Sequence, residues 1–202
     1  MSVQGIICGL GNPGSKYAST RHNIGFMAID RLIQSVNKIP DEQVRLKTEL
    51  PGYILWEWSR LFSPDRWLLL KPMTFMNRSG TAISKIFFKA MMDVDRLMII
   101  HDEVDFPLGK LKIKSGGGLA GHNGLRSIAK ELGTRDFIRL RIGVGRPETG
   151  SDLSDYVLDK FLPGERELRD QVLEKAVLVI RTFCHNGLAM AGEKISTLSR
   201  QP

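Results

Sequence analysis

The chain has 202 residues, of which 42% are hydrophobic and 25% charged, and its formal net charge is +7. This length supports one well-buried core, so we expect a single domain over residues 1–202. No apolar run approaches the roughly 20 residues of a membrane helix, and the N-terminus lacks the basic start of a secretory signal, so we expect a cytoplasmic protein without a membrane partner.

Strand-like and helical segments alternate along the first half of the chain. Residues 38–52 are polar and bounded by prolines, and we expect a loop there. Apolar residues at helical spacing predict a helix from about residue 24 to residue 36, and another is expected to begin with Ser79 as its N-cap. Four segments have the apolar character of buried strands: residues 3–10, 53–58, 66–71 and 96–100.

The second half contains two segments that alternate strictly between basic and apolar residues, KLKIK at 110–114 and FIRLRIGV at 137–144. Between them, a glycine-rich loop leads into a helix. Pro163 opens the last long helix, which HNG at 185–187 closes. Strands that alternate with helices predict an α/β fold, and the hairpin-like strand pairs make its sheet mixed. We therefore expect one three-layer αβα domain around a mixed, twisted central sheet.

The stretch GLGNPG at residues 9–14 matches the G-x-G-x-x-G pattern of dinucleotide-binding loops. In such a loop the third glycine lies in the first turn of a helix, where the pyrophosphate meets the helix N-terminus. Here Asn-Pro-Gly is typical of a turn, and no strand ending in an acid follows about 20 residues later. The pattern favours a sharp turn that presents Asn12 at a strand end, and we expect no cofactor.

Polar residues collect at the ends of several predicted strands: Asn12, His22, Asn23, Asn77, Asp102, His122 and Asn123. Taken singly, each has a simpler interpretation as a turn former or a capping residue, and His101 as a core histidine. Their shared location favours a site, because crevices at the carboxyl ends of strands are where open α/β sheets bind ligands. Cys8 and Cys184 lack C-x-x-C spacing and are expected to be reduced core thiols.

The positive charge is concentrated in one segment. Residues 110–146 hold nine basic and two acidic residues, and this difference of seven equals the net charge of the whole chain. Side chains alternate along a strand, so Lys112 and Lys114 share one face, as do Arg139 and Arg141. This pattern indicates a surface for a polyanion. The alternative is a solvated sheet edge that lysines protect from aggregation.

Five stretches in order resemble bacterial peptidyl-tRNA hydrolases: GLGNPG, TRHNIGF, KPMTFMNRSG, HDEVDFPLGKLKIKSGGGLAGHNG and FIRLRIGVGRP. The resemblance runs from about residue 5 to 147, and SDYVLDKF from residue 151 adds a weaker match. It implies a monomeric, metal-independent cytoplasmic enzyme that cleaves the ester between a peptide and the 3′ end of its tRNA.

The resemblance also implies roles for individual residues. His22 is the general base that activates water, and Asp102 orients its ring. The acceptor end of tRNA, notably its 5′-phosphate, is held by Lys112, Lys114 and Arg141. Asn123 is favoured over Asn12 and Asn77 as the donor to the developing oxyanion. The residues expected to bind the rest of the substrate are Asn12, Tyr17, Phe75, Met76, Asn77, His122 and Asn123.

Parts of the chain depart from the family pattern. Met73 and Phe75 stand where the family more often has Gln and Tyr. Residues 38–67 carry no family motif, and the tryptophans there are expected in the core. Whether residues 148–163 form a lid is open from the sequence. Two other functions stay open: a non-catalytic tRNA- or RNA-binding module, and a metal-dependent hydrolase that uses HDE and Asp105, against which the lack of H-E-x-x-H spacing speaks.

Overall fold

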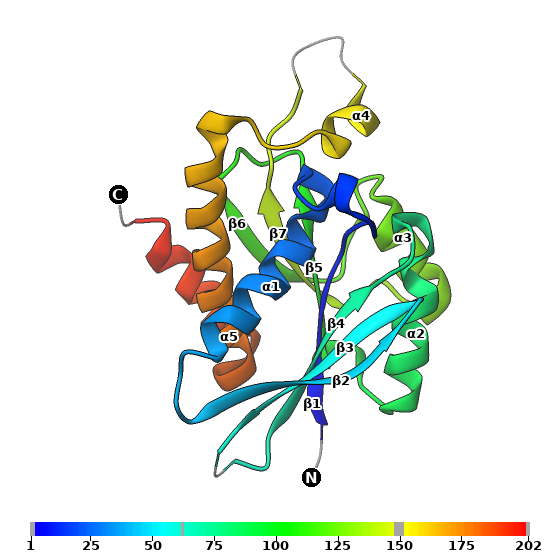
Figure 1. Cartoon of the computed structure of the whole chain (residues 1–202), viewed down its shortest axis with the longest axis vertical. Coiled ribbons are helices and arrows are strands. Elements are labelled where there is room, and N and C mark those ends of the chain that lie inside the picture. Colours follow the sequence, from blue (N-terminus) through cyan, green and yellow to red (C-terminus); the bar gives the residue numbers. More distant parts are fainter. Residues whose placement is uncertain (1–2, 62, 148–151, 201–202) are drawn as a thin grey trace.

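The computed structural model describes residues 3–61, 63–147 and 152–200. These residues form a seven-stranded sheet in the order β2-β3-β4-β1-β5-β7-β6 (Figure 1). The four strands β4, β1, β5 and β7 are parallel, while β2, β3 and β6 pair antiparallel with their neighbours. The predicted mixed sheet is confirmed. Its strands are β1 (Val3–Gly9), β2 (Glu42–Leu50), β3 (Tyr53–Arg60), β4 (Arg66–Pro72), β5 (Leu97–Glu103), β6 (Leu111–Ser115) and β7 (Ile138–Gly143).

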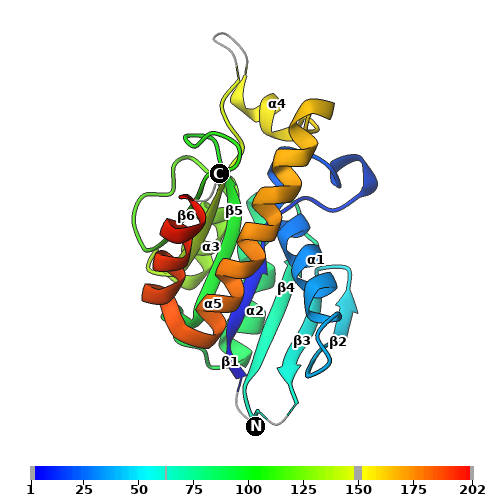
Figure 2. The ribbon, with the colours of Figure 1, turned by 90° about the vertical axis from the view of Figure 1, so that its left-hand side faces the viewer.

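Helices cover both faces of the sheet, which confirms the three layers. Figure 2 shows α1 (Ile24–Val36) and α5 (Arg166–Leu198) in front of the sheet, with α2 (Ser79–Lys89) and α3 (Asn123–Leu132) behind it. Each face has its own buried apolar cluster, with Met98 and Ile100 of β5 on the α1 side and Leu97 and Ile99 on the α2 side. Within the described residues, no helix combines the length and apolar character needed to cross a bilayer.

The loop expected over residues 38–52 is wrong, because Glu42–Leu50 forms the edge strand β2. Most of this strand is exposed, so its sequence lacks the apolar pattern of a buried strand. The buried Glu42 anchors it, accepting hydrogen bonds from Trp58 at 3.1 Å and from both terminal nitrogens of Arg181 at 2.8 Å. Trp58 and Trp67 are buried as expected, and Trp56 packs partly against the same core.

Two predicted helix ends also need correction. Ser79 is the first residue of α2 rather than its N-cap, and its hydroxyl donates to the Met76 carbonyl at 3.0 Å. The last helix does not stop at residues 185–187. It breaks at Gly187, whose φ is 81°, and then continues to Leu198. The second segment is retained because Ala191 and Leu198 are buried against the α1 side of the sheet.

The glycines of GLGNPG and RHNIGF bring β1, β5 and α1 into very close contact. A Cβ atom on Gly25 would lie 2.4 Å from the Ile100 carbonyl oxygen and 2.5 Å from the Leu10 nitrogen. A Cβ atom on Gly9 would lie 2.2 Å from the Gly25 carbonyl oxygen. The two glycines therefore let α1 begin directly against the strand ends. The residues just before α1 are thereby fixed beside the end of β5.

Candidate active site

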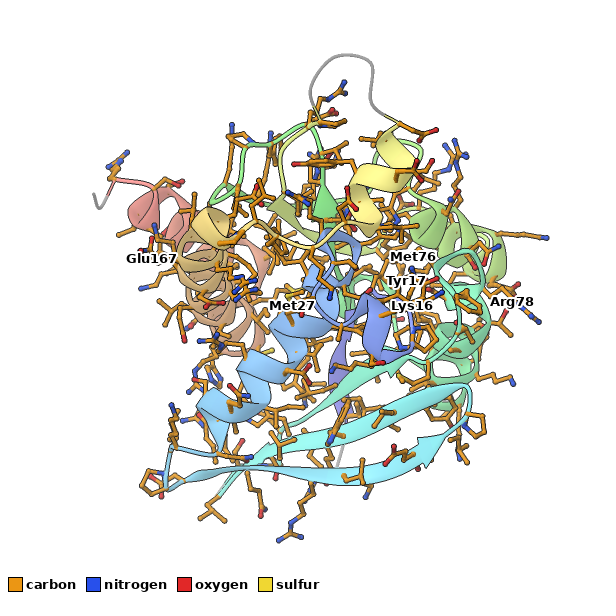
Figure 3. All side chains as sticks on the ribbon, turned by 45° about the horizontal axis from the view of Figure 1, so that its top comes forward. Lys16, Tyr17, Met27, Met76, Arg78 and Glu167 are labelled. Atoms are coloured by element: carbon orange, nitrogen blue, oxygen red, sulfur yellow. The ribbon has the colours of Figure 1, made fainter. Side chains whose placement is uncertain are left out.

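A cleft of about 340 Å³ opens at the carboxyl ends of the parallel strands. Eight of the predicted site residues line it: Asn12, His22, Phe75, Met76, Asn77, Asp102, His122 and Asn123. Tyr17 is not among the lining residues. It packs edge-on against Phe75, with ring centroids 6.4 Å apart, while the Lys16 ammonium lies 4.6 Å from its ring (Figure 3). Lys112, Lys114 and Arg141 lie outside this lining, on β6 and β7.

His22 and Asp102 face each other inside the cleft. His22 belongs to a short 3₁₀ helix, Arg21–Asn23, and Asp102 lies near the end of β5. The His22 Nδ1 atom is 2.9 Å from one Asp102 carboxylate oxygen and 3.0 Å from the other. A carboxylate only accepts hydrogen bonds, so Nδ1 carries the proton. This tautomer leaves a lone pair on Nε2, which makes no hydrogen bond within the described residues.

His122 contacts the same carboxylate through its other ring nitrogen. Its Nε2 atom is 3.1 Å from the Asp102 Oδ1 atom. Its Nδ1 atom accepts from the backbone N–H groups of Gly124 at 3.1 Å and Leu125 at 3.3 Å, so the ring caps α3. Because Nδ1 accepts these two hydrogen bonds, the proton that faces Asp102 is on Nε2. Its position therefore suits it to donate to Asp102 rather than to act as a base.

Asp102 and His22 shift each other's pKa in the directions that favour an ion pair between them. Burial alone would raise the pKa of Asp102, but the charges and hydrogen bonds of His22 and His122 hold it well below its usual value. Burial would likewise lower the pKa of His22, but the charge and hydrogen bond of Asp102 raise it above its usual value. An ionised carboxylate thus stabilises the imidazolium that forms when His22 takes a proton.

His101 is buried on the opposite face of β5 and has no charged role. Burial is the largest cause that lowers its pKa to about 3, so it is neutral. Its Nδ1 atom donates to the Asp102 carbonyl at 2.7 Å, and its Nε2 atom has no hydrogen-bond partner in the described part of the chain. Its ring packs edge-on against His122 with centroids 5.0 Å apart. It therefore helps fix the orientation of His122.

Three asparagine side chains reach the cleft in different ways. Asn12 is buried, and its Oδ1 atom accepts from the Met76 backbone N–H at 2.8 Å. Its backbone is held on both sides by the Asn23 side chain, at 2.8 and 2.9 Å. The Asn12 Nδ2 group is the end left to donate to a ligand. Asn77 and Asn123 are exposed, and their side chains make no hydrogen bond within the described residues.

The basic strands form a cationic face beside the cleft. Lys112 pairs in register with Arg141, and Lys114 with Arg139. Partial burial and the neighbouring charges, Arg139 first, lower the pKa of Lys114 from its usual value. Arg141 is only partly exposed and donates to Glu103, with Nε 2.8 Å and Nη2 2.7 Å from the Glu103 Oε2 atom. The four cations therefore lie on one face of two neighbouring strands.

Sequence reasoning missed two features of this face. Glu103 is buried, lines the cleft and orients Arg141. Arg139, grouped with the surface cations in the sequence, is 2% exposed. The strand register carries the missing signal, because residues two apart on β5 and β7 share one face. His101 and Arg141 are partners in the register of β5 and β7. Glu103 and Arg139 are each two residues away on the same strands, so their side chains lie on the same face.

Within the described residues, one group of side chains lies close enough together to be tested as a metal site. It consists of His22, Asp102 and His122, whose potential ligand atoms all lie within 4.8 Å of one another. Metal binding through the His122 Nε2 atom would place its proton on Nδ1, against the N–H groups of Gly124 and Leu125. The donor set therefore does not fit a metal ion. Asp105, the further ligand of the metal hypothesis, instead accepts from the Arg146 Nε atom at 3.0 Å.

Helix α4 (Leu153–Leu158) forms one wall of the cleft and contributes four lining residues: Leu153, Ser154, Val157 and Leu158. The Tyr156 hydroxyl donates to the Val144 carbonyl at 2.8 Å, and Arg21 donates to the Lys160 carbonyl at 2.9 Å. Residues 148–151 of the segment 148–163, for which the sequence left a lid open, lie outside the described residues. The described part is attached to β7 and to the segment that carries His22.

Comparison with known proteins identifies the family of this chain. The family model described as peptidyl-tRNA hydrolase matches residues 6–202. The peptidyl-tRNA hydrolase of Oleidesulfovibrio alaskensis is 44% identical over 97% of this chain and 98% of its own, and that of Nitratidesulfovibrio vulgaris is 43% identical over the same shares. The crystal structure of the Acinetobacter baumannii peptidyl-tRNA hydrolase matches with a TM-score of 0.84 at 34% identity, covering 95% of this chain and 93% of that one. The chain therefore belongs to the peptidyl-tRNA hydrolase family.

Proposed function

We propose that this chain hydrolyses the ester bond between the peptide and the 3′-terminal ribose of peptidyl-tRNA, with His22 as the base that activates water. Membership of the peptidyl-tRNA hydrolase family supports the reaction. The observation that supports the mechanism is the hydrogen bond from the His22 Nδ1 atom to the Asp102 carboxylate. It directs the basic Nε2 atom away from the carboxylate and towards a substrate in the cleft.

In the proposed reaction, the His22 Nε2 atom takes a proton from a water molecule while the oxygen of that water attacks the ester carbonyl carbon. The resulting imidazolium is stabilised by Asp102, and it returns the proton to the ribose 3′ oxygen as the carbonyl–oxygen bond breaks. The products are a free peptide carboxylate and a tRNA 3′ hydroxyl. A general base in this position contributes roughly 10²–10⁴ in rate. No covalent intermediate is needed, because water is the nucleophile.

We assign stabilisation of the oxyanion to the amide groups around the cleft. Asn123 is our first choice, because it is exposed at the start of α3, directly after the His122 that contacts Asp102. A side-chain amide donates without changing its protonation state, and the loss of one such donor costs about 10²–10³ in kcat. Asn12 and Asn77 would hold the peptide backbone. Met76 and Phe75 supply the apolar wall of the same cleft.

The cationic face formed by Lys112, Lys114 and Arg141 is proposed to hold the acceptor end of tRNA, including its 5′-phosphate. Contacts to phosphate carry no sequence information, which suits an enzyme that acts on many tRNAs. Arg141 offers a planar fork held in place by Glu103, while Lys112 supplies a more flexible charge. A cytoplasmic location and a monomeric state rest on the resemblance and complete the proposal.

The test is hydrolysis of N-acetyl-aminoacyl-tRNA by the purified protein, with and without EDTA. Wild-type turnover is expected to survive chelation, and His22→Asn is expected to lower kcat by at least about 10²-fold. The matched control is His185→Asn, because His185 is an exposed histidine outside the cleft. Binding of the tRNA without turnover would favour the non-catalytic RNA-binding module. Loss of turnover with EDTA would favour the metal-dependent hydrolase.

A further inference from the structure

Arg139 has an unusual environment for a cation. It lies on β7, is 2% exposed, and forms no ion pair within the described residues. Its Nε and Nη2 atoms have no hydrogen-bond partner there either. Burial, followed by the charge of Arg141, lowers its pKa from its usual value, although the charge of Glu103 acts in the opposite direction. A buried cation without a carboxylate partner is destabilising relative to an apolar side chain of similar size. Stability therefore does not explain why an arginine occupies this position.

The hydrogen bond that Arg139 does make is with the glycine-rich loop. Its Nη1 atom donates to the carbonyl oxygen of Gly118 at 2.6 Å. Its Nη2 atom lies beside Gly117, where a Cβ atom would be 3.1 Å from it. The guanidinium thus lies directly beneath the middle of the loop. It connects β7 to a segment that has few other backbone attachments.

The loop needs such an attachment because of its conformation. Residues 116–121 connect β6 to α3 and contain four residues with positive φ: Gly116, Gly117, Ala120 and Gly121. At one end, the Gly116 N–H donates to the Phe137 carbonyl at 3.2 Å. At the other end, the His122 N–H donates to the Leu119 carbonyl at 2.9 Å, which closes a turn within the loop. The centre of the loop is tied to the sheet through the Arg139 hydrogen bond. His122 and Asn123 follow immediately and reach the cleft.

We propose that Arg139 is a positioning residue: it anchors the glycine-rich loop to β7 and so sets the positions of His122 and Asn123 in the cleft. This inference rests on the proposed function, because it acts through the group that stabilises the oxyanion. It assigns Arg139 a role different from that of Arg141, although the two arginines share a strand face. Arg141 presents its guanidinium to an incoming phosphate, whereas Arg139 directs its guanidinium to the loop.

The main variant is Arg139→Met, which keeps the length of the side chain and removes its charge and donors. The variant is expected to fold with an unfolding midpoint equal to or above that of the wild type. Its kcat on N-acetyl-aminoacyl-tRNA is expected to fall roughly 10- to 100-fold, because small displacements of catalytic groups have effects of this size. Its KM stays within about twofold of the wild type. The matched control, Arg141→Met, is expected to raise KM instead.

Two further measurements show whether the effect passes through the loop. In an Asn123→Ala background, Arg139→Met is expected to lower kcat much less than it does alone, because both changes remove one interaction. Amide hydrogen exchange of residues 116–122 is expected to be faster in Arg139→Met, with exchange in β1 and β5 unchanged. Additive effects on kcat, or unchanged exchange in the loop, would overturn the proposal.

The other outcomes are equally decisive. An Arg139→Met variant with wild-type kcat overturns the positioning role, as does one with a raised KM and unchanged kcat, since that result makes Arg139 a phosphate contact. Failure of the variant to fold also overturns it, because the cation would then be kept for stability. If the wild-type protein itself shows no turnover, the proposed function fails, and that result is distinct from any of these.

Discussion

Substitution of Gly25 by alanine tests whether the packing of α1 sets the geometry of the catalytic pair. The new Cβ atom would lie 2.4 Å from the Ile100 carbonyl oxygen and 2.5 Å from the Leu10 nitrogen, both backbone atoms that cannot rotate away. An ordinary contact begins at 3.4 Å, so the start of α1 must move from β5 by about 1 Å. His22 precedes Gly25 by three residues and moves with it. The 2.9 Å hydrogen bond to Asp102 would then be lost.

A displacement of about 1 Å at a catalytic group lowers the rate by about 10²-fold. We therefore expect Gly25→Ala to lower kcat for N-acetyl-aminoacyl-tRNA by about that factor, and to lower the free energy of unfolding by about 1–3 kcal/mol. The control is Gly52→Ala, because a Cβ atom on Gly52 contacts nothing within 4 Å. Single-turnover kinetics on folded protein provide the measurement. A folded Gly25→Ala variant with wild-type kcat would refute the link between helix packing and the catalytic pair.

Three further predictions concern charge. Wild-type kcat should fall at acidic pH with an inflection above pH 6.5, where His22 gains a proton. In Asp102→Asn burial remains and lowers the pKa of His22, so the inflection should move below 6.5; an unmoved inflection contradicts the assigned cause. In urea unfolding, stability should fall between pH 6.5 and about 3, because unfolded His101 gains a proton that the folded form excludes. His101→Asn should reduce that slope by up to about 1.4 kcal/mol per pH unit, and equal slopes argue against it. Lys112→Ala and Arg141→Ala should weaken tRNA binding most at low salt, each reducing the slope of log K against log salt by about one; parallel salt curves exclude the phosphate contacts.

The fold was largely predictable because its central strands and packed helices carry strong periodic patterns. The prediction failed where tertiary contacts override local signals. The sequence of β2 predicts a loop because most of this edge strand is exposed. The strand is stabilised by hydrogen bonds to Glu42 from Trp58 of β3 and from Arg181 of α5. The residues around Gly187 predict a helix end because the sequence does not show that the helical segment after Gly187 packs onto the core.

The position of the site was also predictable, since polar residues at several strand ends must meet at one edge of a parallel sheet. The roles of His22, Asp102 and Asn123 came from family resemblance and stay predictions. No local pattern links His22 to Asp102, which are 80 residues apart. The burial of Arg139 and the contact of Glu103 with Arg141 require the register of β5 and β7, which no local pattern reveals.

The His122 ring connects the start of α3 to the catalytic carboxylate. Its Nδ1 atom caps the first turn of α3, and its Nε2 atom donates a hydrogen bond to Asp102. A displacement of this ring would therefore disturb the start of α3 and the surroundings of the Asp102 carboxylate together.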